Sequence, residues 1–224
     1  MQAPILIAWS GGKDCLLALQ RLRADPAWNV VGLLTTITRQ FDRVAMHGIR
    51  RNVLHAQARA LQLPLIESEL EWPSSNAVYE TAFAEALRRA REITPGLQHI
   101  AFGDLFLGDV RQWREALLGR HGWHGVYPLW GADTRELSRE FVAGGHRAVL
   151  TCVDTMQLDG AFSGRDYDAA LLEGLPANVD PCGEHGEFHT LSHGGPLFAC
   201  DLELRCGESV LREERFQYTD FLLA

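Results

Sequence analysis

Apolar and polar positions follow two different patterns along the first 133 residues. Five short apolar runs have the length and composition of buried strands: residues 3–9, 28–37, 63–70, 99–104 and 126–130. Four intervening segments carry apolar residues at helical spacing: residues 15–24, 50–62, 76–93 and 109–120. Asn76 is expected to cap the third of these helices. Because strands and helices alternate, we predict a doubly wound parallel sheet, an α/β fold with helices on both faces.

The pattern changes in the last 90 or so residues. One more helix and one more strand, over residues 134–153, precede a loop-rich stretch dense in Gly, Asp and Pro. Two final strand-like runs, 197–207 and 209–223, predict an antiparallel hairpin. We therefore expect a nucleotide-type α/β domain over residues 1–133 and a smaller C-terminal α+β domain over residues 134–224.

Composition excludes several classes of protein. Of the 224 residues, 46% are hydrophobic and 22% are charged, which excludes a disordered chain and a coiled coil. The net charge of −8 argues against nucleic acid and anionic membranes as partners. Five scattered cysteines indicate a reducing compartment. The opening residues lack a basic leader and no apolar run has the length of a membrane span, so we expect a cytoplasmic protein.

A glycine-rich segment joins the first predicted strand to the first predicted helix; it reads Ser10-Gly11-Gly12-Lys13-Asp14-Cys15. Two glycines allow a tight turn with inward N–H groups, and the helix N-terminus adds positive dipole, so the segment predicts a phosphate-binding loop. Lys13 is the only lysine, because the other 20 of the 21 basic residues are arginine. A compact ammonium on a thin stem suits such a loop. Asp14 is expected to hold Mg²⁺ or to cap the loop. The glycine spacing excludes both a Walker loop and a dinucleotide fingerprint.

Three blocks of sequence resemble a known family. The glycine-rich loop resembles the PP-loop of the ATP pyrophosphatase superfamily, whose members split ATP between the α and β phosphates. Residues 102–115 and 180–190 resemble two further blocks of the diphthine–ammonia ligase (diphthamide synthase) family within it. The ordered blocks extend over nearly the whole chain and imply a Rossmann-like PP-loop domain that uses ATP and Mg²⁺. The implied ATP-binding residues are Ser10, Gly11, Gly12, Lys13, Asp14, Cys15, Gly103 and Asp104.

Two positions depart from the pattern of that family. The loop ends in Cys15 where the family usually has serine, which removes a hydroxyl donor. The third block reads Glu-Phe-His-Thr over residues 187–190, where members that make diphthamide more typically have Glu-Tyr-Glu-Thr. The acceptor substrate is therefore left open, although ATP binding is expected.

The second block lies where open α/β sheets bind their ligands. Gly103 and Asp104 end the fourth predicted strand, and ligands bind at the carboxyl ends of such strands. Asp104 is expected to hold Mg²⁺ or a ribose, and the metal residues predicted are Asp14 and Asp104. Asp109 and Arg111, about one helical turn beyond, are expected to bind the second substrate, unless they only form ion pairs on an exposed face. His47 is either a third substrate residue or a structural histidine.

The third block is rich in side chains that exchange protons. Glu184 and Glu187 are expected to orient ammonia or to accept a proton from it, and His189 and Thr190 to bind the acceptor. These four are the predicted catalytic residues.

A zinc site is an alternative interpretation of the third block. The spacing of Cys182, His185 and His189 suits zinc, although no clean fourth ligand follows.

The resemblance implies an AMP-forming ligase. Such an enzyme would adenylate a carboxylate with ATP, release pyrophosphate and let ammonia attack to give an amide. The chain has no room for a glutamine-splitting domain, so free ammonia or a separate partner would supply the nitrogen. Two alternatives remain open: a PP-loop enzyme that modifies tRNA, and a non-catalytic ATP- or AMP-binding regulator. A homodimer is also left open.

Overall fold

The protein divides into two compact units. Residues 2–224 are described in a computed structural model. The first unit comprises Met1–Ser10, Asp14–Arg43 and Leu63–Gly131. The second unit comprises Gly11–Lys13, Val44–Gln62 and Ala132–Ala224. The expected boundary at residue 133 stays a prediction. The second compact unit contains residues 44–62 and the middle of the glycine-rich loop together with the C-terminal part of the chain.

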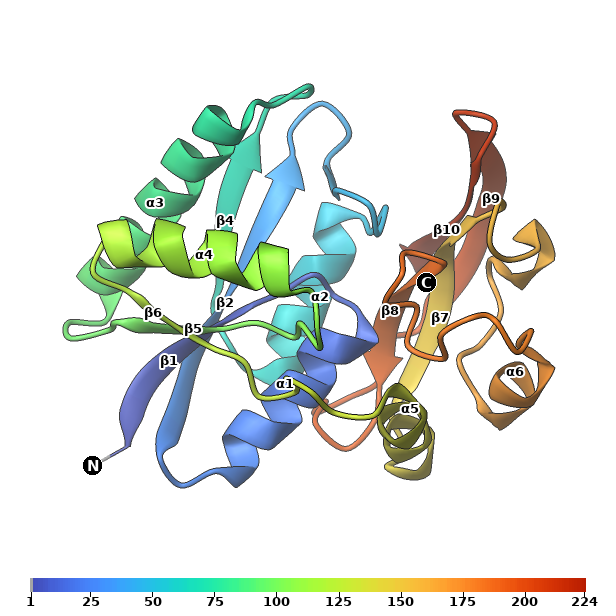
Figure 1. Ribbon diagram of the computed structural model, residues 1–224, viewed down its shortest axis with the longest axis horizontal. Coiled ribbons are helices and arrows are strands. Elements are labelled where there is room, and N and C mark those ends of the chain that lie inside the picture. Colours follow the sequence, from blue (N-terminus) through green and yellow to red (C-terminus); the bar gives the residue numbers. More distant parts are fainter. Residues whose placement is uncertain (1) are drawn as a thin grey trace. The chain divides into compact units, whose positions relative to one another are not determined.

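The first unit is built on a parallel sheet, as the alternating pattern predicts. Its larger elements are β1 (Ala3–Ala8), α1 (Lys13–Ala24), β2 (Trp28–Thr38), β4 (Leu65–Leu70), α3 (Asn76–Ile93), β5 (His99–Ala101), α4 (Gly108–Arg120) and β6 (His124–Val126), drawn in Figure 1. A two-residue strand β3 (Arg43–Val44) also pairs with β2. The pairs β4–β2, β2–β1, β1–β5 and β5–β6 are all parallel.

The strand order of this sheet reverses between β1 and β5. Read across the parallel strands it is β4-β2-β1-β5-β6, so the chain winds outward from β1 in both directions. Such a reversal is the switch point at which doubly wound sheets bind ligands, beyond the carboxyl ends of the strands. The segments that leave β1 and β5 at these ends contain Ser10 and Gly103. The predicted doubly wound α/β class is confirmed.

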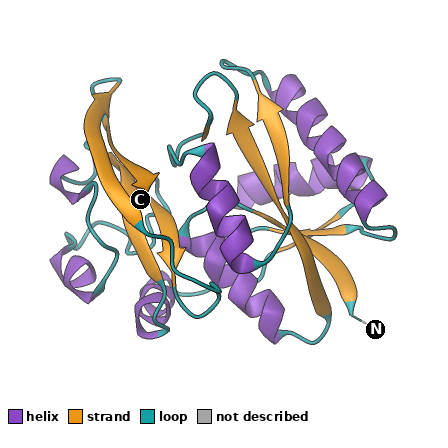
Figure 2. Ribbon diagram, turned by 180° about the vertical axis from the view of Figure 1, so that it is seen from behind, coloured by secondary structure: helices purple, strands orange, loops and turns teal. Residues whose placement is uncertain are grey.

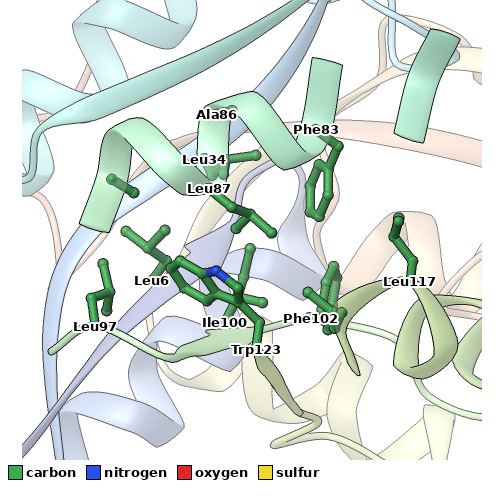
Figure 3. Close-up of a cluster of buried hydrophobic side chains, with 12 residues drawn as sticks. Leu6, Leu34, Phe83, Ala86, Leu87, Leu97, Ile100, Phe102, Leu117 and Trp123 are labelled. Atoms are coloured by element: carbon green, nitrogen blue, oxygen red, sulfur yellow. The ribbon is translucent and has the colours of Figure 1, made fainter. Parts of the chain in front are cut away.

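One face of the parallel sheet is packed against α3 and α4. Leu6 of β1 and Leu34 of β2 meet the apolar sides of both helices in a buried cluster (Figure 3). The helices and the loop before β6 contribute Phe83, Ala86, Leu87, Ala90, Leu117, Leu118 and Trp123. The opposite face of the sheet is also buried. It carries Ile5, Ile7 and Leu33, which alternate along β1 and β2 with Leu6 and Leu34 and are fully buried, so both faces of the sheet are covered.

The second unit contains an antiparallel sheet. Its elements are α2 (Arg51–Leu61), α5 (Thr134–Ala143), β7 (Arg147–Asp154), a short 3₁₀ helix (Gly160–Phe162), α6 (Ala169–Gly174), β8 (Phe188–Gly194), β9 (Leu204–Arg212) and β10 (Phe216–Leu223). The strand order is β8-β7-β10-β9, and all three pairings are antiparallel; Figure 2 shows the strands in orange. The smaller α+β domain expected at the C-terminus matches this sheet and its helices. Strand β8 is at an edge of the sheet, which matters for the site.

Some local predictions were wrong in detail. Helix α3 is capped by Ser75, whose hydroxyl accepts a hydrogen bond from the amide of Val78, and Asn76 is the first helical residue. The C-terminal hairpin exists, but it turns within the second predicted run, where Glu213 and Glu214 have positive φ. Strand β9 instead runs through Gly207.

Two strands differ from the sequence pattern. The last parallel strand is β6, earlier than the apolar run at 126–130, because its pairing with β5 is confined to three residues. Strand β8 was not predicted, since polar and glycine residues interrupt it. Among residues 2–224, no helix is both long and apolar enough to cross a membrane.

Candidate functional site

The two loop glycines are required by close neighbours. Gly11 has φ of +86°, and a Cβ there would lie 2.8 Å from the Cδ1 atom of Ile49. A Cβ at Gly12 would lie 3.0 Å from the Cε1 atom of His47 and 3.2 Å from the carbonyl oxygen of Thr190. The loop backbone is therefore in contact with two predicted site residues that are distant from it in sequence.

Thr190 of β8 connects the loop to His47. Its hydroxyl accepts a hydrogen bond from the backbone N–H of Lys13 at 3.0 Å, and both groups are buried. Its carbonyl oxygen lies 3.1 Å from Nδ1 of His47. Because a carbonyl only accepts, this contact favours the tautomer of His47 that carries its proton on Nδ1. The second unit thus brings together residues 12, 13, 47 and 190.

Lys13 is buried and is held by the third sequence block. Its ammonium donates to the carbonyl oxygen of Cys182 and lies 5.9 Å from the ring centroid of Tyr167 and 6.0 Å from that of Phe188. A nearby carbonyl acceptor and two ring faces at 5.9 and 6.0 Å suit a compact point charge better than a planar guanidinium fork. This environment gives a physical reason for the one lysine of the chain. Direct contact of Lys13 with phosphate stays a prediction.

His189 is held in its neutral form. Burial lowers the pKa of its imidazole to about 3, with further contributions from the charges of His47 and Lys13. The rings of His47 and His189 lie side by side, with centroids 4.7 Å apart. At neutral pH His189 can therefore accept a hydrogen bond from a substrate without adding a second positive charge beside Lys13.

Glu187 organises the third block. Its two carboxylate oxygens accept hydrogen bonds from the backbone N–H groups of Asp180 and His185, both at 2.9 Å, and the side chain is buried. The amide of Glu184 lies 3.4 Å from the carboxylate of Asp180. These contacts make Glu187 a support for the segment from Asp180 to His185. Proton transfer by Glu184 or Glu187 stays a prediction.

The first unit holds the other predicted residues. Ser10 donates its hydroxyl to the sulfur of Cys15 at 3.6 Å. A Cβ at Gly103 would lie 2.9 Å from the carbonyl carbon of Asp14, so glycine is needed where β5 ends beside the loop. Backbones from the β1 and β5 ends thus approach each other at the switch point. Ser10 is thus in contact with Cys15, and Gly103 with Asp14; binding of ATP by these residues stays a prediction.

Asp104 forms an ion pair with Arg114. The Arg114 guanidinium also lies 4.5 Å from the ring centroid of Phe102, so this arginine is held from two sides. The predicted metal role of Asp104 therefore competes with an arginine already bound to it. Nothing in the sequence shows that Arg114 meets Asp104, because the two residues are ten positions apart.

Arg111 and Asp109 lie on α4. The Arg111 guanidinium is 4.4 Å from the ring centroid of Tyr127 and 4.5 Å from that of Trp130, and it donates to Glu115 at 2.8 Å. Asp109 is in the first turn of the helix. The aromatic contacts fix Arg111 in place beyond the ion pair that the sequence suggested.

Among residues 2–224 no group of three or more His, Cys, Asp or Glu side chains is arranged to hold a metal ion. The zinc arrangement of Cys182, His185 and His189 is therefore not formed. Mg²⁺ commonly takes only one or two carboxylates together with substrate phosphates, so Asp14 remains a candidate ligand.

Three site residues were missed in the sequence. Tyr167 donates its hydroxyl to the carbonyl of Pro181 at 2.6 Å, and no motif marks it. Ser192 and Gln57 both bond to Gly11. A signal existed for Gln57, since it is a polar residue on the apolar face of a periodic helix.

Comparison with known proteins identifies relatives over both units. A family model of the diphthamide synthase N-terminal domain matches residues 3–124, and one of the diphthamide synthase C-terminal domain matches residues 133–219. A diphthine–ammonia ligase of Schizosaccharomyces pombe is 25% identical over 206 residues, which cover 84% of this chain and 34% of the relative. The chain thus spans about a third of the length of that curated relative.

Proposed function

This chain belongs to the diphthamide synthase family, and on that premise we propose that it is an ATP-dependent, AMP-forming carbon–nitrogen ligase. It adenylates a carboxylate, releases pyrophosphate and transfers ammonia to the activated carbonyl. The name of the matched relative, diphthine–ammonia ligase, supports ammonia as the nitrogen donor. The acceptor is a carboxylate of the diphthine type or another one.

The observation that carries the proposal is the contact between the glycine-rich loop and the third block. Residue 13 bonds to Thr190 through its amide and to Cys182 through its ammonium. A ligase of this kind must hold the α-phosphate of ATP beside the acceptor carboxylate, so that the attacking oxygen is in line with the departing pyrophosphate. A loop packed directly on the acceptor block meets that requirement.

Each part of the site has a proposed task. The N–H groups of the loop and the N-terminus of α1 bind phosphate oxygens, while Lys13 contributes a positive charge that offsets the charge developing on pyrophosphate. Asp14 is the carboxylate proposed to hold Mg²⁺, which when bound would neutralise phosphate charge. Asp104 can bind Mg²⁺ only if its ion pair with Arg114 breaks or if one carboxylate oxygen stays available to the metal.

The second half-reaction uses the residues around β8. The nitrogen of ammonia attacks the carbonyl carbon of the acyl-adenylate, a C–N bond forms, and the C–O bond to AMP breaks. Neutral His189 accepts a hydrogen bond from ammonia and so orients its lone pair toward the carbonyl. The proton lost by the new amide passes to the carboxylate of Glu184.

The test measures AMP and pyrophosphate released from ATP with ammonium chloride and a panel of carboxylates. We expect AMP, and no ADP, from the wild type. Lys13→Ala should lose ATP affinity, whereas Glu187→Ala should still bind ATP and turn over slowly, because Glu187 supports only the third block. Formation of ADP, or equal loss of ATP affinity in both variants, would contradict the proposal.

A further inference from the structure

The glycine-rich loop lies along the free edge of β8. Strand β8 ends the four-stranded sheet, so its outer backbone groups need partners. The N–H of Ser192 donates to the carbonyl of Gly11 at 2.8 Å, and the N–H of Lys13 donates to the hydroxyl of Thr190 at 3.0 Å. Residue numbers rise on the loop while they fall on β8, which is an antiparallel arrangement.

A single side chain from α2 joins these two segments. Gln57 is fully buried, and its amide nitrogen donates to the carbonyl of Gly11 at 2.9 Å and to the carbonyl of Ser192 at 2.6 Å. A primary amide has two N–H donors, so one nitrogen can satisfy two carbonyls at once. The carbonyl of Gly11 accepts from Gln57 and from Ser192, using both of its lone pairs.

The surroundings of Gln57 leave little freedom for a different arrangement. Its neighbours on the buried face of α2 are apolar and include Val53, Leu54 and Ala58. An unpaired amide there would cost about 1–3 kcal/mol, so the two bonds to carbonyls are strongly favoured. Gly11 has positive φ, and the Oε1 atom of Gln57 is 3.0 Å from where a Cβ would be. Gln57 therefore fixes Gly11 in a conformation that only glycine adopts easily.

We infer that Gln57 is a positioning residue of the nucleotide site, which sets the shape of the loop before ATP arrives. This inference rests on the proposed function for the identity of the ligand. A loop already held in its binding shape loses less conformational freedom when phosphate binds, and affinity rises accordingly. Gln57 would thus act on ATP affinity and the KM for ATP, with little effect on kcat.

Two variants remove the donors in different ways. Gln57→Met keeps the length of the side chain and removes both N–H groups; Gln57→Glu keeps the shape and places an acceptor against two carbonyls. Gln62→Glu, at the exposed end of the same helix, is the matched control. Hydrogen exchange is measured without nucleotide, and ATP affinity, KM and kcat are measured separately.

We expect amide exchange at Lys13 and Ser192 to become at least tenfold faster in both Gln57 variants, while the core of β7 is unchanged. The Kd and KM for ATP should rise about tenfold, and kcat should change less than threefold. The control should match the wild type in all three measurements. Faster exchange throughout the protein would show a merely structural role and would overturn the inference, as would unchanged loop exchange or unchanged ATP affinity.

Two further outcomes keep the inference separate from the proposed function. If the wild type binds no ATP, the proposed function fails, and the role of Gln57 in nucleotide binding fails with it. Faster hydrogen exchange confined to the loop amides of the Gln57 variants would then show only that Gln57 sets the shape of the loop. If neither variant folds, hydrogen exchange of the wild type without nucleotide still tests the inference. The inference requires that the amides of Lys13 and Ser192 exchange as slowly as those of β7. Fast exchange there overturns the inference.

Discussion

At the scale of single residues, the site depends on charges placed where water cannot reach. Lys13 is the clearest case, because its ammonium is buried against one carbonyl and two ring faces. The sequence indicated that this lysine is special, since arginine stands at 20 of the 21 basic positions. It did not show which groups surround the ammonium, because the carbonyl of Cys182 is 169 residues away.

The first prediction concerns the size of the Lys13 site. Lys13→Arg should be more destabilising than Lys13→Met, because the larger guanidinium overpacks a buried site beside the rings of Tyr167 and Phe188, whereas a methionine fills the space of the lysine stem. We expect losses of about 3 kcal/mol and about 1–2 kcal/mol in the free energy of unfolding. Urea denaturation measures both. A more stable arginine variant would contradict this account.

The second prediction concerns pH. Because the folded protein lowers the pKa of His189 from 6.5 to about 3, the unfolded chain binds that proton more readily between these values. Stability is therefore complete above pH 6.5 and falls as the pH is lowered toward 3. From pH 7.5 to pH 5.0 the wild type should lose about 2 kcal/mol more than His189→Gln, at about 1.4 kcal/mol per pKa unit.

Urea denaturation of both proteins at the two pH values gives the comparison. Other titrating groups are common to both and cancel in the difference. Equal losses in the two proteins would mean that His189 is not held neutral.

At the scale of elements, the turn between β9 and β10 is joined to β7 by a buried carboxylate. Asp154, at the end of β7, accepts hydrogen bonds from Arg215 at 2.9 and 2.6 Å. The hydrogen bonds from Arg215 are the main reason why the pKa of Asp154 is well below its usual range. Hydrogen bonds from Gln157 and from the Met156 amide lower this pKa further. Asp154 is buried while Arg215 is about half exposed, so the carboxylate depends on its partners more than the arginine does.

The third prediction follows from this pair. Asp154→Asn should lower the free energy of unfolding by about 2 kcal/mol, because an amide cannot accept at both positions and carries no charge. Glu85→Gln, in the exposed pair with Arg88 on α3, is the control and should cost less than about 0.5 kcal/mol. Thermal or urea unfolding of the two variants measures the difference. Similar losses in both would contradict the role given to Asp154.

The spacing of apolar residues predicted well the helices that pack on one side, and predicted poorly the strand at a sheet edge. Helices α2 and α3 follow the apolar spacing closely because each buries one stripe. Strand β8 was missed because its pattern is broken by His189, Ser192 and Gly194, whose partners lie on other segments. Its position beside β7 gives those residues a strand conformation that their own propensity does not favour.

At the scale of the whole molecule, the chain crosses twice into the second unit before reaching residue 132. Residues 11–13 and 44–62 are part of that unit, which a cut at residue 133 would divide. Two contacts illustrate the point: the amide of Ala199 donates to the carbonyl of Ala60 at 2.7 Å, and Arg50 bonds to Asp220.

The fourth prediction is that the chain does not separate at residue 133. A fragment of residues 134–224 lacks α2 and the loop that covers the edge of β8, so it should show no cooperative unfolding transition and little dispersion of amide NMR signals. When a fragment of residues 1–133 is added and binds to the first fragment, the cooperative unfolding transition and the dispersion of amide signals should both return. A fragment 134–224 that folds cooperatively alone would contradict the division into units.

The sequence alone determined the order and type of most elements, the glycine-rich turn after the first strand and the family. These properties depend on neighbours along the chain: apolar spacing buries a helix stripe, and two glycines permit a tight turn. Only the tertiary structure decided what surrounds that turn. Lys13 and Thr190 are 177 residues apart, and the neutral state of His189 comes from burial and from charges on other segments. Hydrogen bonds and desolvation act over a few ångströms in space, whatever the separation along the chain.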